Sequence, residues 1–167
     1  MAQLTHQPNR LQKFLQFIPK SKWGSWLFAR TLHHPDRPML RLSHGRHSLT
    51  SMLSGLPIVM VTTLGAKSGQ PRSLPLVAIP DGENVILIAS NFGQQHHPAW
   101  YYNLHAHPEV QLTYEGRTVT YLARETNGAE CDRCWQRAVG VYPGYANYKQ
   151  RAAHRTIGVF LLTPQVK

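Results

Sequence analysis

A short turn between two apolar runs constrains the fold of this chain more than any other feature of its sequence. The turn covers residues 65–72, and its two glycines let the backbone bend sharply and approach a ligand closely. The apolar runs on either side, residues 57–64 and 72–79, have the composition of β-strands bounded by turn residues. The pattern therefore predicts two neighbouring strands joined by an accessible turn.

The same turn carries groups suited to an anion. Lys67 and Arg72 supply positive charge, Ser68 supplies a hydroxyl, and backbone N–H groups in such a turn can form an anion-binding nest. A nucleotide-triphosphatase P-loop does not fit, because that motif needs Gly directly before the Lys, where Ala66 stands. The turn therefore indicates a phosphate grip, and a hairpin whose cations are only solvated is the open alternative.

The distribution of charge also indicates an anionic partner. The formal net charge is +10, and ten of the 18 Lys and Arg residues, but only one of the eight acids, lie at or before Arg72. A phosphorylated cofactor, an acidic membrane surface or nucleic acid would suit this asymmetry. We expect no nucleic acid, because the chain has no helix-turn-helix, zinc-finger or RNA-binding signature.

The N-terminal segment, residues 9–30, reads as a basic amphipathic helix. Its apolar residues recur at i, i+3, i+4 and i+7 from Leu11 to Ile18, with Lys and Arg around them and two tryptophans after them. Such a helix can lie on an acidic membrane surface, or it can dock on its own domain. Neither a secretion signal nor an apolar run of about 18 residues is present, so we expect a cytoplasmic protein, with this segment as a link to the inner face of the membrane.

Cysteine and histidine give no metal or redox motif. Cys131 and Cys134 fall inside an apparent helix, whereas a redox pair usually opens one, and a zinc site would need two more ligands. Four histidines gather between residues 96 and 107, without the acid and spacing of a zinc enzyme. We therefore expect no metal and treat these side chains as surface or core residues.

The remaining pattern predicts an α+β fold that is mainly antiparallel β. Strand character covers residues 57–64, 72–79, 85–90, 109–124 (divided by a turn at 115–116) and 156–162. Helical character covers residues 98–106, 129–141 and 144–153. Short antiparallel strands with packed helices favour a small barrel over a parallel sheet. We expect a helical extension over residues 1–32 and one domain over residues 33–167.

Two more clusters could carry chemistry. Ser90 and Asn91 end the third strand, and the helix from Pro98 offers its positive end and the flat face of Trp100 to an anion or an electron-rich ring. Three tyrosines recur every three residues and can donate hydrogen bonds or protons into an apolar pocket. They are Tyr142, Tyr145 and Tyr148. Core packing is the alternative for both clusters.

In combination and in order, these motifs resemble the deazaflavin (coenzyme F-420)-dependent nitroreductase and quinone reductase family. The resemblance runs from about His33 to Pro164. It is carried by Arg41-Leu42 with Gly45-Arg46, by residues 62–72 with Pro75-Leu76, and by residues 89–91, 97–104 and 142–148. It implies a split β-barrel related to FMN-binding oxidoreductases, and reduced F-420 as the hydride donor.

By position, the resemblance also implies the roles of individual residues. The cofactor's phosphate and acidic tail would be held by Lys67, Ser68 and Arg72. The ring and ribityl region would be lined by Ser90, Asn91, Pro98, Ala99, Trp100 and Asn103. The acceptor pocket would be formed by Tyr142, Tyr145 and Tyr148, with Ser90 near the substrate. The family's amphipathic N-terminus is associated with membrane quinones.

The chain departs from many family members after the serine, where Asn91-Phe92-Gly93 replaces Lys-Gly-Gly. One cofactor cation is therefore absent, and we expect Phe92 to narrow the pocket. We expect an oxidoreductase that passes a hydride from F-420 to a quinone-like, enone or nitroaromatic acceptor, with Tyr145 as the donor to the oxygen that gains charge. The alternatives are a non-catalytic carrier of the same cofactor and an FMN-dependent reductase on the same barrel.

Overall fold

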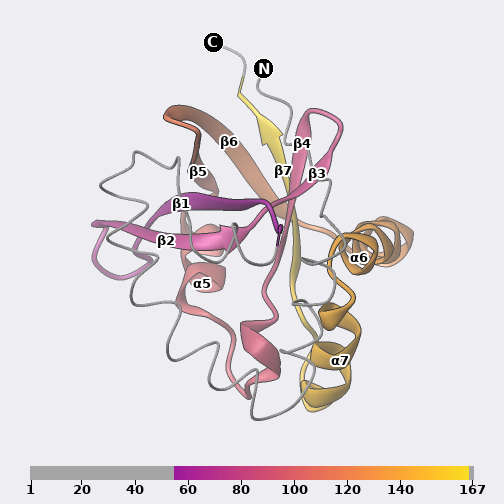
Figure 1. The fold of residues 1–167 in the computed structure, drawn as a ribbon. Helices are drawn as coiled ribbons and strands as arrows, with labels where there is room; N and C mark the ends of the chain where they lie inside the picture. Colours follow the sequence, from indigo (N-terminus) through magenta and orange to yellow (C-terminus); the bar gives the residue numbers. More distant parts are fainter. Residues whose placement is uncertain (1–54, 166–167) are drawn as a thin grey trace.

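In the computed structural model, seven strands form one curled antiparallel sheet, with three α-helices against it (Figure 1). The structure describes residues 55–165, so the expected helical extension and the motif at residues 41–46 lie outside the described residues. The strands are β1 (Ile58–Leu64), β2 (Pro71–Val77), β3 (Ile79–Asp81), β4 (Asn84–Ile88), β5 (Glu109–Tyr114), β6 (Arg117–Glu125) and β7 (Val159–Pro164). The helices are the 3-10 turn η2 (Asn91–Gly93), α5 (Ala99–Ala106), α6 (Gly128–Val141) and α7 (Gly144–Arg151).

The sheet curls until its two edges become consecutive in the chain. The strand order is β2-β1-β5-β6-β7-β4-β3, and all neighbours are antiparallel. Only Ala78 separates the two edge strands, and its N–H donates to the Pro57 carbonyl at the start of β1, at 2.9 Å. Curling in this way shields sheet edges that would otherwise invite pairing with other chains. The predicted split barrel with packed helices is confirmed.

Strand β1 is almost continuously apolar because both of its faces are buried. Val59 and Val61 point into the inner core, where Trp100 of α5 also packs. Ile58 and Met60 point to the other side, into the outer core beneath α6 and α7. Two-sided burial removes the alternation of apolar and polar residues that a half-exposed strand would show. The apolar run of the sequence therefore corresponds to a strand between two cores.

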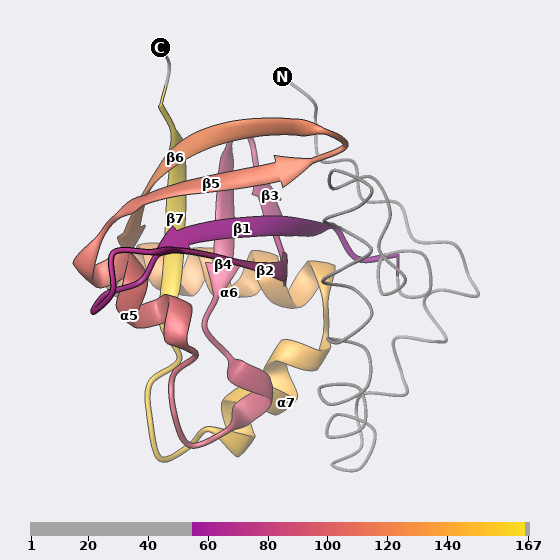
Figure 2. The same ribbon diagram turned by 90° about the vertical axis from the view of Figure 1, so that its left-hand side faces the viewer.

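The structure corrects the sequence prediction at two places. The run 72–79 contains a break at Ala78, so β2 ends at Val77 and the last residue of the run, Ile79, starts β3. The segment after β4, which the sequence predicts as the end of the third strand, forms η2. Figure 2 shows this short turn beside α7, beneath the curled sheet. No helix of the described residues is long and apolar enough to cross a bilayer.

Candidate functional site

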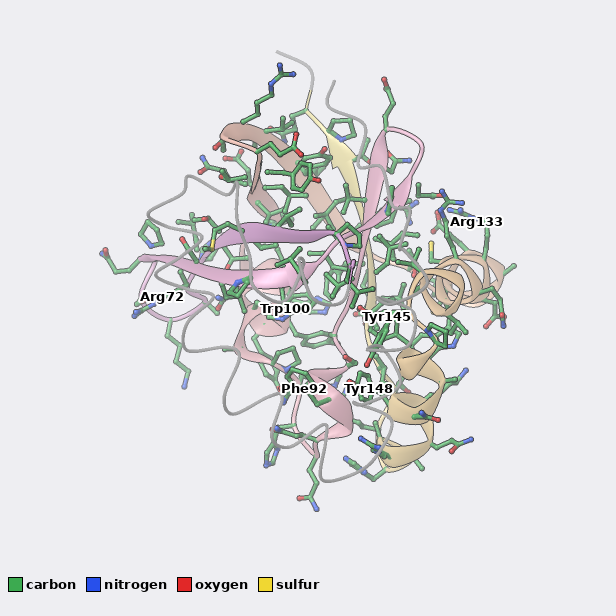
Figure 3. The ribbon with its side chains drawn as sticks, viewed as in Figure 1. Arg72, Phe92, Trp100, Arg133, Tyr145 and Tyr148 are labelled. Atoms are coloured by element: carbon green, nitrogen blue, oxygen red, sulfur yellow. The ribbon has the colours of Figure 1, made fainter. Side chains whose placement is uncertain are left out.

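A cleft of about 1170 Å³ opens between the β1–β2 turn, η2, the start of α5 and the tyrosines of α7. The structure brings all twelve predicted site residues to its lining: Lys67, Ser68, Arg72, Ser90, Asn91, Pro98, Ala99, Trp100, Asn103, Tyr142, Tyr145 and Tyr148. In the view of Figure 3, Arg72 lies toward one end, Tyr145 and Tyr148 toward the other, and Trp100 between them. The cleft therefore has a cationic end and an aromatic end.

The turn at the cationic end needs both of its glycines. Gly65 donates to the Gln70 carbonyl at 2.9 Å and accepts from the Gly69 N–H at 2.8 Å. Gly69 has a φ of +62°, which most residues with a side chain adopt at a cost. A Cβ at position 65 would lie 2.5 Å from the Ser68 hydroxyl oxygen. The turn is thus a closed loop with Ser68 folded inward.

Asn103 holds this turn against the barrel. Its Oδ1 accepts from the Ala66 N–H at 3.0 Å, and its Nδ2 donates to Thr63 Oγ1 at 2.9 Å. Both Asn103 and Thr63 are buried, so each bond replaces one to water. Asn103 lines the cleft, and its hydrogen bonds make it a positioning residue for the turn.

The cationic end has unused binding capacity. Lys67 and Arg72 are exposed, and neither forms an ion pair with an acid of the described residues. No described residue accepts a hydrogen bond from the N–H groups of Lys67 and Ser68. Free cations and free N–H groups on one turn are the arrangement that binds a phosphate.

Ser90 lies on the wall between the two ends. Its side chain is buried, with 8% exposure, and its hydroxyl has no hydrogen bond to a described residue. Its carbonyl, by contrast, accepts from Arg155 Nη2 at 2.9 Å. Arg155 also donates to the Gln94 carbonyl at 3.0 Å and so anchors the loop that carries Ser90.

Arg155, which supports the Ser90 loop, could not be recognised from the sequence. No local pattern marks it, because its partners lie about 60 positions earlier in the chain. Its guanidinium is 3.4 Å from His97 Nδ1. Burial and the nearby Arg155 lower the pKa of His97, in that order, which favours the neutral ring.

The aromatic end is built from three buried tyrosines. The Tyr142 and Tyr148 hydroxyls are hydrogen-bonded to each other at 3.2 Å, and the Tyr145 ring meets both neighbours edge to face. Gly144 makes room for this cluster, since a Cβ there would lie 2.2 Å from Tyr142 Cζ. The tyrosines belong to the outer core, as the alternative of core packing predicts, and they also line the cleft.

Tyr145 differs from the other two tyrosines in its hydroxyl. The residue is 4% exposed, and no described residue forms a hydrogen bond with its Oη. Burial raises the pKa of both Tyr142 and Tyr145 far above the usual tyrosine value, so both stay protonated at neutral pH. Tyr145 is thus a protonated donor without an acceptor among residues 55–165.

The cysteines and histidines form no ligand cluster in the part of the chain that the structure describes. No three His, Cys, Asp or Glu residues there are placed to hold a metal ion. Cys134 is buried in the outer core on α6, as expected for a core cysteine. His97 stacks on Tyr101 with ring centroids 4.0 Å apart, and His105 Nε2 lies 2.9 Å from Glu125.

Three known proteins are similar to this chain over most of their length. The F420H(2)-dependent quinone reductase Rv1261c of Mycobacterium tuberculosis is 33% identical over 110 residues, which cover 64% of this chain and 73% of the relative. The structure of an F420-H2 dependent reductase, FDR-A, is 38% identical with a TM-score of 0.59, covering 64% of this chain and 93% of that one. A structure described as a domain-swapped dimer is 34% identical with a TM-score of 0.60, covering 77% and 96%.

The family assignment rests on a match to a family model. The model of the F420H(2)-dependent quinone reductase family matches residues 37–164. This match includes the cationic turn, the Ser90 loop and the tyrosine cluster, and it begins and ends close to the limits of the resemblance seen in the sequence. The chain belongs to the F420H(2)-dependent quinone reductase family.

Proposed function

We propose that this protein transfers a hydride from reduced coenzyme F-420 to a quinone-like acceptor within the cleft. As a member of its family the chain is an oxidoreductase that uses F-420, and the relatives' names specify a quinone as acceptor. Enones and nitroaromatics belong to the same proposal as further acceptors. The observation that carries it is the Tyr145 hydroxyl, a buried donor to which no described residue offers an acceptor, in a cleft whose opposite end is cationic.

The residues of the cleft fit this cofactor. Lys67 and Arg72 would hold its phosphate and acidic tail, together with the N–H groups that no described residue uses. The ring and ribityl region would be lined by Trp100, the first turn of α5, Ser90 and Asn91. When bound, the deazaflavin supplies a hydride, and the protein supplies orientation and electrostatics.

The tyrosine end is suited to the acceptor. An oxygen that gains negative charge during reduction is stabilised by a preorganised donor in a site that excludes water. Tyr145 supplies that donor without first breaking a bond to another described residue. Tyr142 and Tyr148 keep the wall in place through their mutual hydrogen bond. A second donor, the Ser90 hydroxyl, lies on the same cleft.

The test is turnover with reduced F-420 across a panel of quinones, enones and nitroaromatics. We expect quinones to be reduced, with F-420 bound more tightly than FMN in competition. Cofactor binding without turnover of any acceptor would favour a carrier protein. Tighter binding of FMN would favour a flavin enzyme on the same barrel.

We also propose that residues 9–30 bring the protein to an acidic membrane surface. The basic amphipathic pattern and its tryptophans support this, since each cation near an acidic leaflet contributes about 1 kcal/mol. The full chain is expected to float with vesicles rich in phosphatidylglycerol and not with neutral vesicles, and a chain without residues 1–32 is expected to lose this. Equal flotation of both chains would contradict the proposal.

A further inference from the structure

We infer that Phe92 is a specificity-determining residue, which makes the aromatic end of the cleft select flat, slender acceptor rings over bulky ones. The inference rests on the proposed function, because it concerns the acceptor of that same site. Phe92 lines the cleft and packs against the outer core beside the tyrosines. Its ring meets Tyr148 edge to face, with centroids 6.0 Å apart and planes at 76°, and Figure 3 shows the two side by side.

The backbone at Phe92 has a conformation that a bulky residue rarely adopts. Asn91, Phe92 and Gly93 all have positive φ, at 45°, 55° and 78°. Glycine adopts this region freely, whereas residues with a Cβ pay a strain energy there. Backbone strain of this kind persists where the surroundings impose it, and it concentrates at functional sites.

The surroundings do impose the conformation of Phe92. On the N-terminal side, Arg155 fixes the Ser90 carbonyl at 2.9 Å. The Asn91 side chain, one residue before Phe92, donates to the carbonyl of His96, four residues after it, at 2.9 Å. Gly93 lies so close to α7 that a Cβ there would be 2.7 Å from Arg151 Cβ. The Cα–Cβ bond of Phe92 is therefore held in one direction, and its ring lies against Tyr148.

This placement has a consequence for the acceptor. Phe92 adds an aromatic ring to the wall formed by Tyr142, Tyr145 and Tyr148, and it takes up space at that wall. A flat ring gains from edge-to-face or offset contact with such neighbours, by an amount that corresponds to about a fivefold change in affinity. An acceptor with bulky substituents must instead displace a ring that its backbone holds in place. A rigid side chain at this wall can select acceptors by their shape, whereas a flexible side chain would move aside.

The kinetic test compares 1,4-naphthoquinone with 2,6-di-tert-butyl-1,4-benzoquinone. In Phe92→Ala, we expect KM for the flat quinone to rise about fivefold and the ratio of kcat/KM to move about tenfold toward the bulky one. Phe92→Leu should change KM and the ratio by amounts between those of the unaltered protein and Phe92→Ala. In both variants the dissociation constant of F-420 should stay within about twofold of its value in the unaltered protein. Tyr102→Ala, which removes a half-exposed ring elsewhere on the cleft, should leave the ratio unchanged.

A second test needs neither cofactor nor acceptor. Phe92→Gly and Phe92→Ala both remove the ring, but only glycine removes the backbone strain, so the glycine variant should unfold at a higher urea concentration than the alanine variant. An unchanged acceptor ratio in Phe92→Ala, with quinone turnover by the unaltered chain, would overturn this inference alone. Equal urea midpoints of the glycine and alanine variants would show that the backbone at position 92 is not strained, and would overturn the inference that its ring is rigidly placed. Failure of the unaltered chain to reduce any quinone would overturn the proposed function as well.

Discussion

Tyr145 is 4% exposed, yet its hydroxyl has no hydrogen-bond partner among the described residues. An unpaired buried hydroxyl costs about 1–3 kcal/mol, so the Tyr145→Phe variant should be as stable as the unaltered protein or more stable by about 1 kcal/mol. Its turnover should fall about a hundredfold, because the donor to the charged oxygen is lost. Steady-state kinetics and urea unfolding measure these two quantities. Equal turnover would reduce Tyr145 to a packing residue.

Tyr142→Phe provides the matched control for that substitution. It removes a hydroxyl that is already bonded to Tyr148, at 3.2 Å, in the same cluster. We expect it to lose about 1 kcal/mol of stability and to retain more turnover than Tyr145→Phe. The opposite order of the two variants would assign the donor role to Tyr142.

Asn103 should affect cofactor binding indirectly, because it holds the β1–β2 turn in place. In Asn103→Ala the Ala66 N–H and the Thr63 hydroxyl lose their shared partner, which should lower stability by about 2 kcal/mol. A loosened turn should also weaken F-420 binding, by about tenfold, measured by fluorescence titration. Thr63→Val, which removes only one of the two bonds, should have the smaller effect. Unchanged affinity in Asn103→Ala would limit its role to stability.

At the scale of elements, the β1–β2 turn is expected to bind the anionic part of the cofactor. Replacing Lys67 and Arg72 together by alanine should weaken F-420 binding at low salt by about a hundredfold and make it less sensitive to salt. Titrations at two ionic strengths check this, with Arg117→Ala as a control on the distant β5–β6 hairpin. An affinity that does not change would remove the phosphate grip from the proposal.

Elements with a strong local pattern could be predicted from the sequence, and those fixed by distant contacts could not. The periodic tyrosines before and within α7 and the apolar run of β1 each carry their own signal over several residues. η2 carries none, because its left-handed backbone is imposed by Arg155 and by the approach of α7. The break at Ala78 likewise follows from closure of the sheet.

For the whole molecule, the buried tyrosines predict the response to alkaline pH. Below pH 10 both the folded and the unfolded chain keep these protons. Above it, the unfolded chain releases them while the folded chain retains them on Tyr142 and Tyr145, so the free energy of unfolding falls. Each tyrosine contributes about 1.4 kcal/mol per pH unit. Urea unfolding at pH 9, 10 and 11 should show this loss, and Tyr145→Phe should show less of it. An equal slope in both proteins would contradict the assignment.

The candidate site could be predicted as a set of residues, but not as a set of contacts. The three clusters were recognisable because each lies within one short segment, and their order matched a family. Their meeting on one cleft depends on the fold. The parts held through space, such as Arg155 and the bond between Asn103 and Thr63, have no counterpart in local sequence. The membrane prediction and the boundary at residues 32–33 fall outside the described residues and stay predictions.

A single residue joins β2, which follows the cationic turn, to β3 at the other edge of the sheet. A ligand that steadies the turn should therefore slow amide hydrogen exchange along β2 and β3 as far as Asp81, at the opposite margin of the sheet. Ligand binding in the cleft and opening of the barrel would then be thermodynamically coupled.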